Sequence, residues 1–183
     1  MKVTLDHNCL IHIKQNSPEG QIIKSLLNQS ELEFYVVNIG SSELRQGGIR
    51  PDSYSTFEDF LNKINLHELS RLNPMGLVDI TFFDYCIFAD QPMVDLSKEI
   101  KSILFTKEIE NDSIIEQPPF KPIGRKWLNR ICDTHSLWCH IHYGNDIFLT
   151  SDRNFLKKTK KPKLVALGAK QIMLPEELNA QYV

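Results

Sequence analysis

Short apolar runs alternate with longer amphipathic stretches along the chain. The short runs are apolar, often rich in β-branched and aromatic residues, and most stop at polar or turn residues, which is typical of buried strands. They predict five strands, at Val3–Leu5, Phe34–Ile39, Leu77–Phe82, Ile147–Thr150 and Gln171–Leu174.

Between these runs, apolar residues recur at helical spacing. Helices are predicted from Ser17 onward, after Gly40 with a serine as its cap, around Phe57–Ile64, over Met93–Leu104, and over Arg125–Tyr143, where Gly144 ends the helix. Gly47–Pro51 is expected to break a helix, and Thr106–Gly124 is expected to be a loop. Strands that alternate with helices favour an α/β fold, with a mainly parallel central sheet and helices on both faces.

The composition narrows the class of protein. A chain of 183 residues fits one domain, and its 42% hydrophobic and 24% charged residues are those of a globular protein. The net charge of -2 argues against a basic coat for non-specific nucleic-acid binding. No apolar run reaches the ~18 residues of a membrane span, and Asp6, His7 and Asn8 interrupt the one opening run, so no secretory segment is expected.

The cysteines indicate a reducing compartment. Four cysteines are too few for a disulfide scaffold, and they form no Cys-x-x-Cys motif. We therefore expect reduced, buried thiols and a cytoplasmic protein. The residues are Cys9, Cys86, Cys132 and Cys139.

Four acidic residues occupy positions that such a sheet would bring together. Asp6 follows the first predicted strand, and Asp152 follows the strand that ends at Thr150. Glu43 lies just after the second strand, and Asp133 lies in the helix that leads to the fourth. Because ligands of these sheets bind outside the carboxyl ends of the strands, we expect the four carboxylates to converge at one edge.

Converging carboxylates repel one another, and each raises the pKa of the others. A hard cation such as Mg²⁺ or Mn²⁺ neutralises them and accepts oxygen ligands. Such an ion can activate a water molecule and stabilise charge on a phosphate. The residues alone therefore suggest metal-assisted hydrolysis of phosphodiester bonds.

The same residues resemble a known family. Leu5–Ile11 is similar to the opening of PIN-domain nucleases, in which a strand Asp is followed two residues later by Asn. Ser41–Leu44 resembles the family's Glu-bearing helix start. Asp133–Phe155, with its Thr-Ser-Asp sequence, and Gly168–Leu178, with its Pro-Glu-Glu sequence, resemble later parts of the family pattern in the same order.

This resemblance implies a PIN-like three-layer α/β/α fold and a divalent-metal-dependent nuclease, related to the ribonucleases of toxin–antitoxin pairs and acting on RNA rather than DNA. Asn8 and Thr150 would support the metal ligands by hydrogen bonds. The catalytic residues, which would also ligate one or two Mg²⁺ or Mn²⁺ ions, are Asp6, Glu43, Asp133 and Asp152. We expect one PIN-like domain over residues 1–183, with segments near 47–73 and 106–129 that exceed the family's compact toxins.

Basic residues flank two of the acids and could contact substrate phosphates. They are Arg125, Lys126 and Arg130 before Asp133, and Lys157 and Lys158 after Asp152. A solvated surface explains them equally well.

Other functions stay open at this point. A catalytically silent PIN-like module that binds nucleic acid or protein would keep the fold without the metal. A phosphate-accepting receiver domain also needs an Asp beyond a parallel strand, but it normally has an acidic pair there, and Asp6 has His7 and Asn8 beside it. An antitoxin-like protein partner and a homodimer are both compatible with the sequence.

Overall fold

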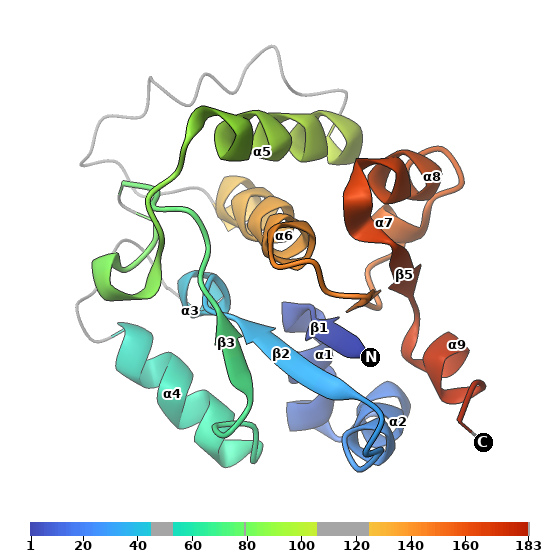
Figure 1. Cartoon of the computed structure of the whole chain (residues 1–183). Helices are drawn as coiled ribbons and strands as arrows, with labels where there is room; N and C mark the ends of the chain where they lie inside the picture. The colour runs from blue at the N-terminus through green and yellow to red at the C-terminus, as the bar shows by residue number, and fades with distance from the viewer. Residues whose placement is uncertain (45–52, 79, 106–124, 183) are drawn as a thin grey trace.

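The computed structural model describes residues 1–44, 53–78, 80–105 and 125–182, and it has a five-stranded parallel sheet at its centre (Figure 1). The strand order is β3-β2-β1-β4-β5, and every neighbouring pair is parallel. The strands are β1 (Lys2–Leu5), β2 (Glu33–Val37), β3 (Ser70–Leu72), β4 (Ile147–Leu149) and β5 (Gln171–Met173). The predicted α/β class with a mainly parallel sheet is confirmed.

Helices cover both faces of the sheet and make three layers (Figure 1). One layer holds α1 (His7–Gln15), α2 (Pro18–Leu26), α4 (Ser53–Lys63) and α9 (Pro175–Asn179). The other holds α5 (Gln91–Leu104), α6 (Arg125–His142), α7 (Arg153–Leu156) and α8 (Lys161–Leu164). Shorter turns complete the described elements: α3 (Gly40–Glu43), η1 (Phe83–Tyr85) and η2 (Val165–Ala169).

The chain runs outward from β1 to β2 and β3, and then crosses back to β4 and β5 on the other side of β1. The strand order therefore reverses between β1 and β4. In open parallel sheets this switch point, at the carboxyl ends of the strands, is where ligands bind. The topology places the residues after β1 and after β4 side by side at that point.

The centre of the sheet is apolar because both of its faces are buried, and β4 is apolar and buried at every position, whereas the edge strand β3 contains Ser70 and Arg71. In β4, Ile147 and Leu149 pack into the core beneath α1 and α2, whereas Phe148 packs into the core beneath α5 and α6. In β1, Val3 and Leu5 face the core beneath α1 and α2, and Thr4 faces the layer that contains α5 and α6. This alternation with a period of two fixes which residue at each strand end points toward which layer.

Three expectations about the elements were wrong, for local reasons. Among the described residues of Leu77–Phe82 none lies in a strand, because the Thr81 hydroxyl accepts from the Leu77 amide and closes a turn there. The third strand is Ser70–Leu72, which pairs with β2. A helix that was not predicted, α1, begins directly after Asp6.

The third error concerns α3, whose cap is Ile39 without a side-chain hydrogen bond, although a serine cap was expected. The predicted break at Gly47–Pro51 lies outside the described residues. The predicted loop Thr106–Gly124 also lies outside them. Among the described residues, no helix combines the length and the apolar character needed to cross a membrane.

Replacing Phe148 by Ala tests the core between the sheet and helices α5 and α6. Phe148 is fully buried and packs against Phe155 at 5.2 Å between ring centroids. We expect Phe148→Ala to lower the free energy of unfolding by about 3–5 kcal/mol, because it leaves a cavity. The control is Phe88→Ala, since Phe88 is 88% exposed and its loss should change stability by less than about 0.5 kcal/mol. Equal losses in urea titrations of the two variants would contradict this account of the core.

Candidate active site

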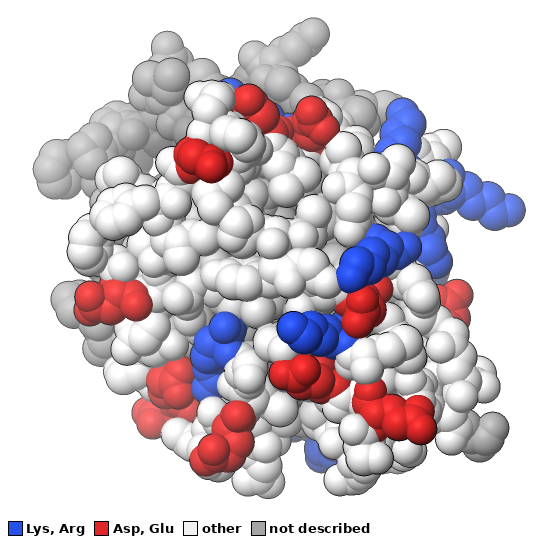
Figure 2. Space-filling view, in the orientation of Figure 1, with Lys and Arg blue, Asp and Glu red and all other residues white. Residues whose placement is uncertain are grey.

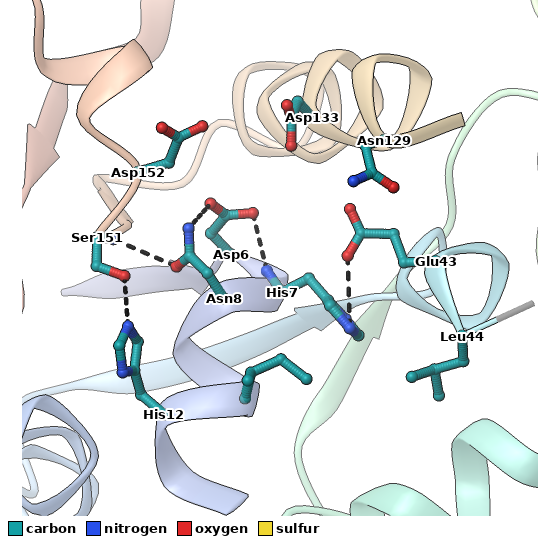
Figure 3. A pocket seen from close by; sticks show the side chains of 11 residues that line it. Asp6, His7, Asn8, His12, Glu43, Leu44, Asn129, Asp133, Ser151 and Asp152 are labelled. Atoms are coloured by element: carbon teal, nitrogen blue, oxygen red, sulfur yellow. Dashed lines mark hydrogen bonds and ion pairs between the residues drawn. The ribbon is translucent and has the colours of Figure 1, made fainter. Parts of the chain in front are cut away.

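A pocket of about 640 Å³ opens at the carboxyl edge of the sheet, over the switch point between β1 and β4. It brings together all four predicted acids, from the end of β1, α3, α6 and the turn after β4 (Figure 3). The residues that line it are Asp6, His7, Asn8, Ile11, His12, Glu43, Leu44, Asn129, Asp133, Ser151 and Asp152.

Asp6 is the most tightly held of the acids. Its Oδ1 accepts a hydrogen bond from the His7 amide at 2.8 Å, so it caps the N-terminus of α1. Its Oδ2 accepts from Asn8 Nδ2 at 2.8 Å and from Thr150 Oγ1 at 2.6 Å. Burial raises the pKa of this carboxyl to about 6, although the three hydrogen bonds act in the opposite direction.

Asn8 and Thr150 tie the two strand ends together around Asp6. The Asn8 amide also donates to Thr150 Oγ1, at 3.1 Å, and its carbonyl accepts from the Ser151 amide at 3.2 Å. Thr150 Oγ1 in turn accepts from the Asp152 amide at 3.0 Å. The rotamer of Asp6 and the path of the chain into Asp152 are therefore fixed by one hydrogen-bond network.

Asp152 caps the short helix α7, with its Oδ1 accepting from the Asn154 amide at 2.7 Å. Its other oxygen has no hydrogen-bond partner within the described part of the chain. Asp6 and Asp152 thus have a structural role at helix starts and also present carboxylate to the pocket.

Glu43 and Asp133 face Asp6 from the other side of the pocket (Figure 3). Burial, followed by repulsion from Asp6 and Asp133, raises the pKa of Glu43 well above its ordinary value. Burial, followed by repulsion from Asp6 and Asp152, raises the pKa of Asp133 to about 8. His7 Nε2 lies 3.4 Å from Glu43 Oε2 and holds that side chain in place. The four carboxyls are therefore electrostatically coupled.

The donor set suits a hard divalent cation, because it consists of carboxylates whose mutual repulsion such a cation would relieve. The side chains are nevertheless not gathered around one point: among the described His, Cys, Asp and Glu residues, no group of three or more is close enough to hold a metal ion. The residues fit the cation by chemistry and by pocket, and the structure does not show a preformed cage.

The basic residues that were predicted to contact phosphate do not line the pocket, as far as their side chains are described. Of the described Lys and Arg residues, none lines the pocket. The Arg130 guanidinium lies over the Phe105 ring at 5.6 Å, and Lys157 Nζ donates to Asn154 at 3.2 Å. Lys126 and Lys158 are exposed, and the side chain of Arg125 lies outside the description. Basic side chains gather over the edge formed by α7 and α8 (Figure 2).

Six pocket residues were not predicted as site residues: His7, Ile11, His12, Leu44, Asn129 and Ser151. Asn129 precedes Asp133 by one helical turn, so the i, i+4 spacing on α6 could have indicated it. His12 likewise follows Asn8 by one turn of α1, and Ser151 stands between Thr150 and Asp152. The contact between His12 and Ser151 could not be predicted, because α1 itself was not predicted.

Comparison with protein-family models, with curated proteins and with solved structures finds no match in any of the three. The resemblance to PIN-domain nucleases therefore stays a prediction, and the pocket is the structural feature that bears on function.

Replacing Asp133 by Asn tests the raised pKa of this carboxyl. A carboxyl whose pKa is raised from 3.8 to about 8 stabilises the fold when it is protonated, and this stability is lost as the pH rises toward 8. In chelator, the wild-type protein should therefore lose stability between pH 6 and pH 8 at up to about 1.4 kcal/mol per pH unit for this one group. Asp133→Asn should lose less stability over this range, so the free energy of unfolding of the variant rises relative to that of the wild type as the pH increases.

Thermal and urea unfolding across this pH range measure the effect. The matched control is Asp95→Asn, because Asp95 is exposed and its partners within the described part of the chain are Lys98 and Gln91 on its own helix. If Asp133→Asn and Asp95→Asn follow the same pH dependence as the wild type, the pKa of Asp133 is not raised.

Proposed function

We propose that this protein is a divalent-metal-dependent nuclease with a PIN-like fold, which hydrolyses phosphodiester bonds of RNA. One observation carries the proposal: four coupled carboxylates line a single pocket at the switch point of a parallel sheet. Buried acids with strongly raised pKa values in a cleft are typical of catalytic sites. The preference for RNA over DNA rests on the resemblance to the family.

In this proposal Asp6, Asp152 and Asp133 hold the cation. When bound, Mg²⁺ or Mn²⁺ supplies positive charge that stabilises the reacting phosphate and favours ionisation of water. Asn8 and Thr150 fix the orientation of Asp6, since both donate to its Oδ2. A side chain held in this way presents its oxygen to a ligand without further loss of rotamer freedom.

Glu43 has a different role. His7 lies against one of its oxygens, at 3.4 Å, and the other oxygen points into the pocket toward Asp133 and Asn129 (Figure 3). We assign to this free oxygen the orientation of the attacking water for in-line displacement. Glu43 is suited to accept the water's proton because its pKa is raised by burial and by neighbouring carboxylates.

A second candidate function is a catalytically silent PIN-like binding module. It is favoured by the absence, among the described residues, of any three His, Cys, Asp or Glu side chains placed to hold a metal ion. Such a module would bind nucleic acid or protein without needing the cation. The same assay separates the two functions.

The test is a cleavage assay with labelled single-stranded RNA, double-stranded RNA and single-stranded DNA, in Mn²⁺, in Mg²⁺ and in chelator. We expect metal-dependent cutting of RNA. Asp6→Asn and Asp152→Asn should each reduce the rate by at least about 100-fold, because a lost ligand removes several kcal/mol of charge stabilisation.

Asp95→Asn serves as the control, since it removes one exposed carboxylate and should leave the rate unchanged. Unfolding curves for all variants verify that they are folded at the assay temperature. Cutting that persists in chelator, or in both Asp6→Asn and Asp152→Asn, would refute the proposed site. A folded wild-type protein that binds RNA but cuts none of the substrates would identify the binding module.

A further inference from the structure

A chain of hydrogen bonds leads from the protein surface into the pocket, beside the carboxylates. Glu19 Oε2 accepts from the Ser17 hydroxyl at 2.9 Å, and Ser17 Oγ lies 2.9 Å from His12 Nδ1. His12 Nε2 lies 2.9 Å from Ser151 Oγ, and the two side chains face each other across the pocket wall (Figure 3). His12 and Ser151 both line the pocket.

The position of each proton follows from counting donors and acceptors. An ionised Glu19 can only accept, so the single hydroxyl proton of Ser17 points to Glu19. Ser17 Oγ must then accept from His12, which places a proton on Nδ1. In the neutral ring Nε2 is therefore an acceptor, and the Ser151 hydroxyl donates to it. In the imidazolium, Nε2 donates instead, and the Ser151 proton is free to point into the pocket.

The backbone holds this chain of groups rigidly. Asn16, in the left-handed conformation at φ 52°, ends α1, and Ser17 then caps α2 through the Gly20 amide at 3.2 Å. Gly20 packs directly on α1, where a Cβ atom would lie 2.2 Å from the His12 carbonyl oxygen. At the other end, the Ser151 amide is bound to Asn8. Both ends of this series of hydrogen bonds are thus fixed to the elements that carry the acids.

The carboxylates of the proposed nuclease can accept protons, but hydrolysis also requires a donor for the leaving oxygen. We infer that Ser151 donates this proton and that His12 resupplies it, oriented by Ser17 and Glu19. This inference rests on the proposed function. Glu19 Oε2 also lies 3.6 Å from His12 Nδ1, while the other ring nitrogen faces Ser151.

The oxygen of a water molecule forms a bond to phosphorus, and the bond from phosphorus to the leaving oxygen breaks. The leaving oxygen takes the Ser151 hydroxyl proton, and Ser151 takes the proton from Nε2 of the imidazolium. The attacking water releases one proton, and His12 regains one from solvent, so the protein returns to its starting state.

A change of leaving group separates this role from a structural one. A nucleoside 4-nitrophenyl phosphodiester releases 4-nitrophenolate, which leaves without needing a proton, whereas RNA releases an alkoxide. We expect Ser151→Ala and His12→Gln to cut RNA about 10²- to 10⁴-fold more slowly, the usual contribution of a proton donor. Both should hydrolyse the activated diester at nearly the wild-type rate.

His12→Gln is the sharper variant, because an amide still hydrogen-bonds Ser151 but cannot carry the proton. His67→Gln is its matched control, since His67 is exposed in the turn before β3, at the opposite edge of the sheet, and its only described ion pair is with Glu68. This control should leave both rates unchanged. Unfolding curves of His12→Gln and Ser151→Ala establish that loss of rate is not loss of fold.

Asp6→Asn, measured with both substrates, separates this inference from the proposed function. If Asp6→Asn is inactive on both substrates while His12→Gln and Ser151→Ala spare the activated diester, both proposals stand. If His12→Gln and Ser151→Ala slow the two substrates by the same factor, or slow neither, the proton relay is overturned and the nuclease site stands. If Asp6→Asn retains activity, or the wild type hydrolyses neither substrate, the proposed function fails and the relay fails with it.

Discussion

The constraint on which the rest of this structure depends is the burial of negative charge where the strand order reverses. Asp6 is 3% exposed, and its neighbours in the pocket are further carboxylates. Such an arrangement destabilises the fold unless protons or a cation compensate it, which is why the pKa of Asp133 rises to about 8. The surrounding elements hold the acids in place: two of them cap helices, and Asn8 and Thr150 join the ends of the two central strands.

The sequence predicted an element correctly wherever the residues of that element alone show its hydrophobic pattern. Long amphipathic stretches gave α5 and α6, and buried apolar runs gave four of the strands within a residue or two. The third strand escaped because Ser70–Leu72 is only three residues long and is held by its pairing with β2, a contact that is not local in sequence. The apolar run Leu77–Phe82 suggested a strand, but the Thr81 hydroxyl satisfies the Leu77 amide and favours a turn.

The acids of the site could be predicted because each stands at a strand end or in a helix beside one, so topology alone gathers them. The supporting groups could be predicted only in part. His12 approaches Ser151 across 139 residues of sequence, and this contact depends on the unpredicted α1 and on the close packing of Gly20. Basic residues that lie near the acids in sequence did not indicate which side chains line the pocket. Arg130 stacks on Phe105, and Lys157 donates a hydrogen bond to Asn154. Closeness along the chain therefore did not bring the described basic side chains into the pocket.

If Asp6, Asp133 and Asp152 together hold a divalent cation, with Glu43 beside them, the protein must bind that cation through these carboxylates. The most direct measurement is calorimetric titration of the metal-free protein with Mn²⁺ at constant pH in two buffers of different ionisation enthalpy, which gives both the affinity and the protons released. The account predicts saturable binding with release of protons, because the raised pKa values of Asp6 and Asp133 mean that binding must displace protons. Binding should be abolished in Asp6→Asn and kept in Asp95→Asn. No saturable binding by the folded wild-type protein, or equal binding by Asp6→Asn, would contradict the account.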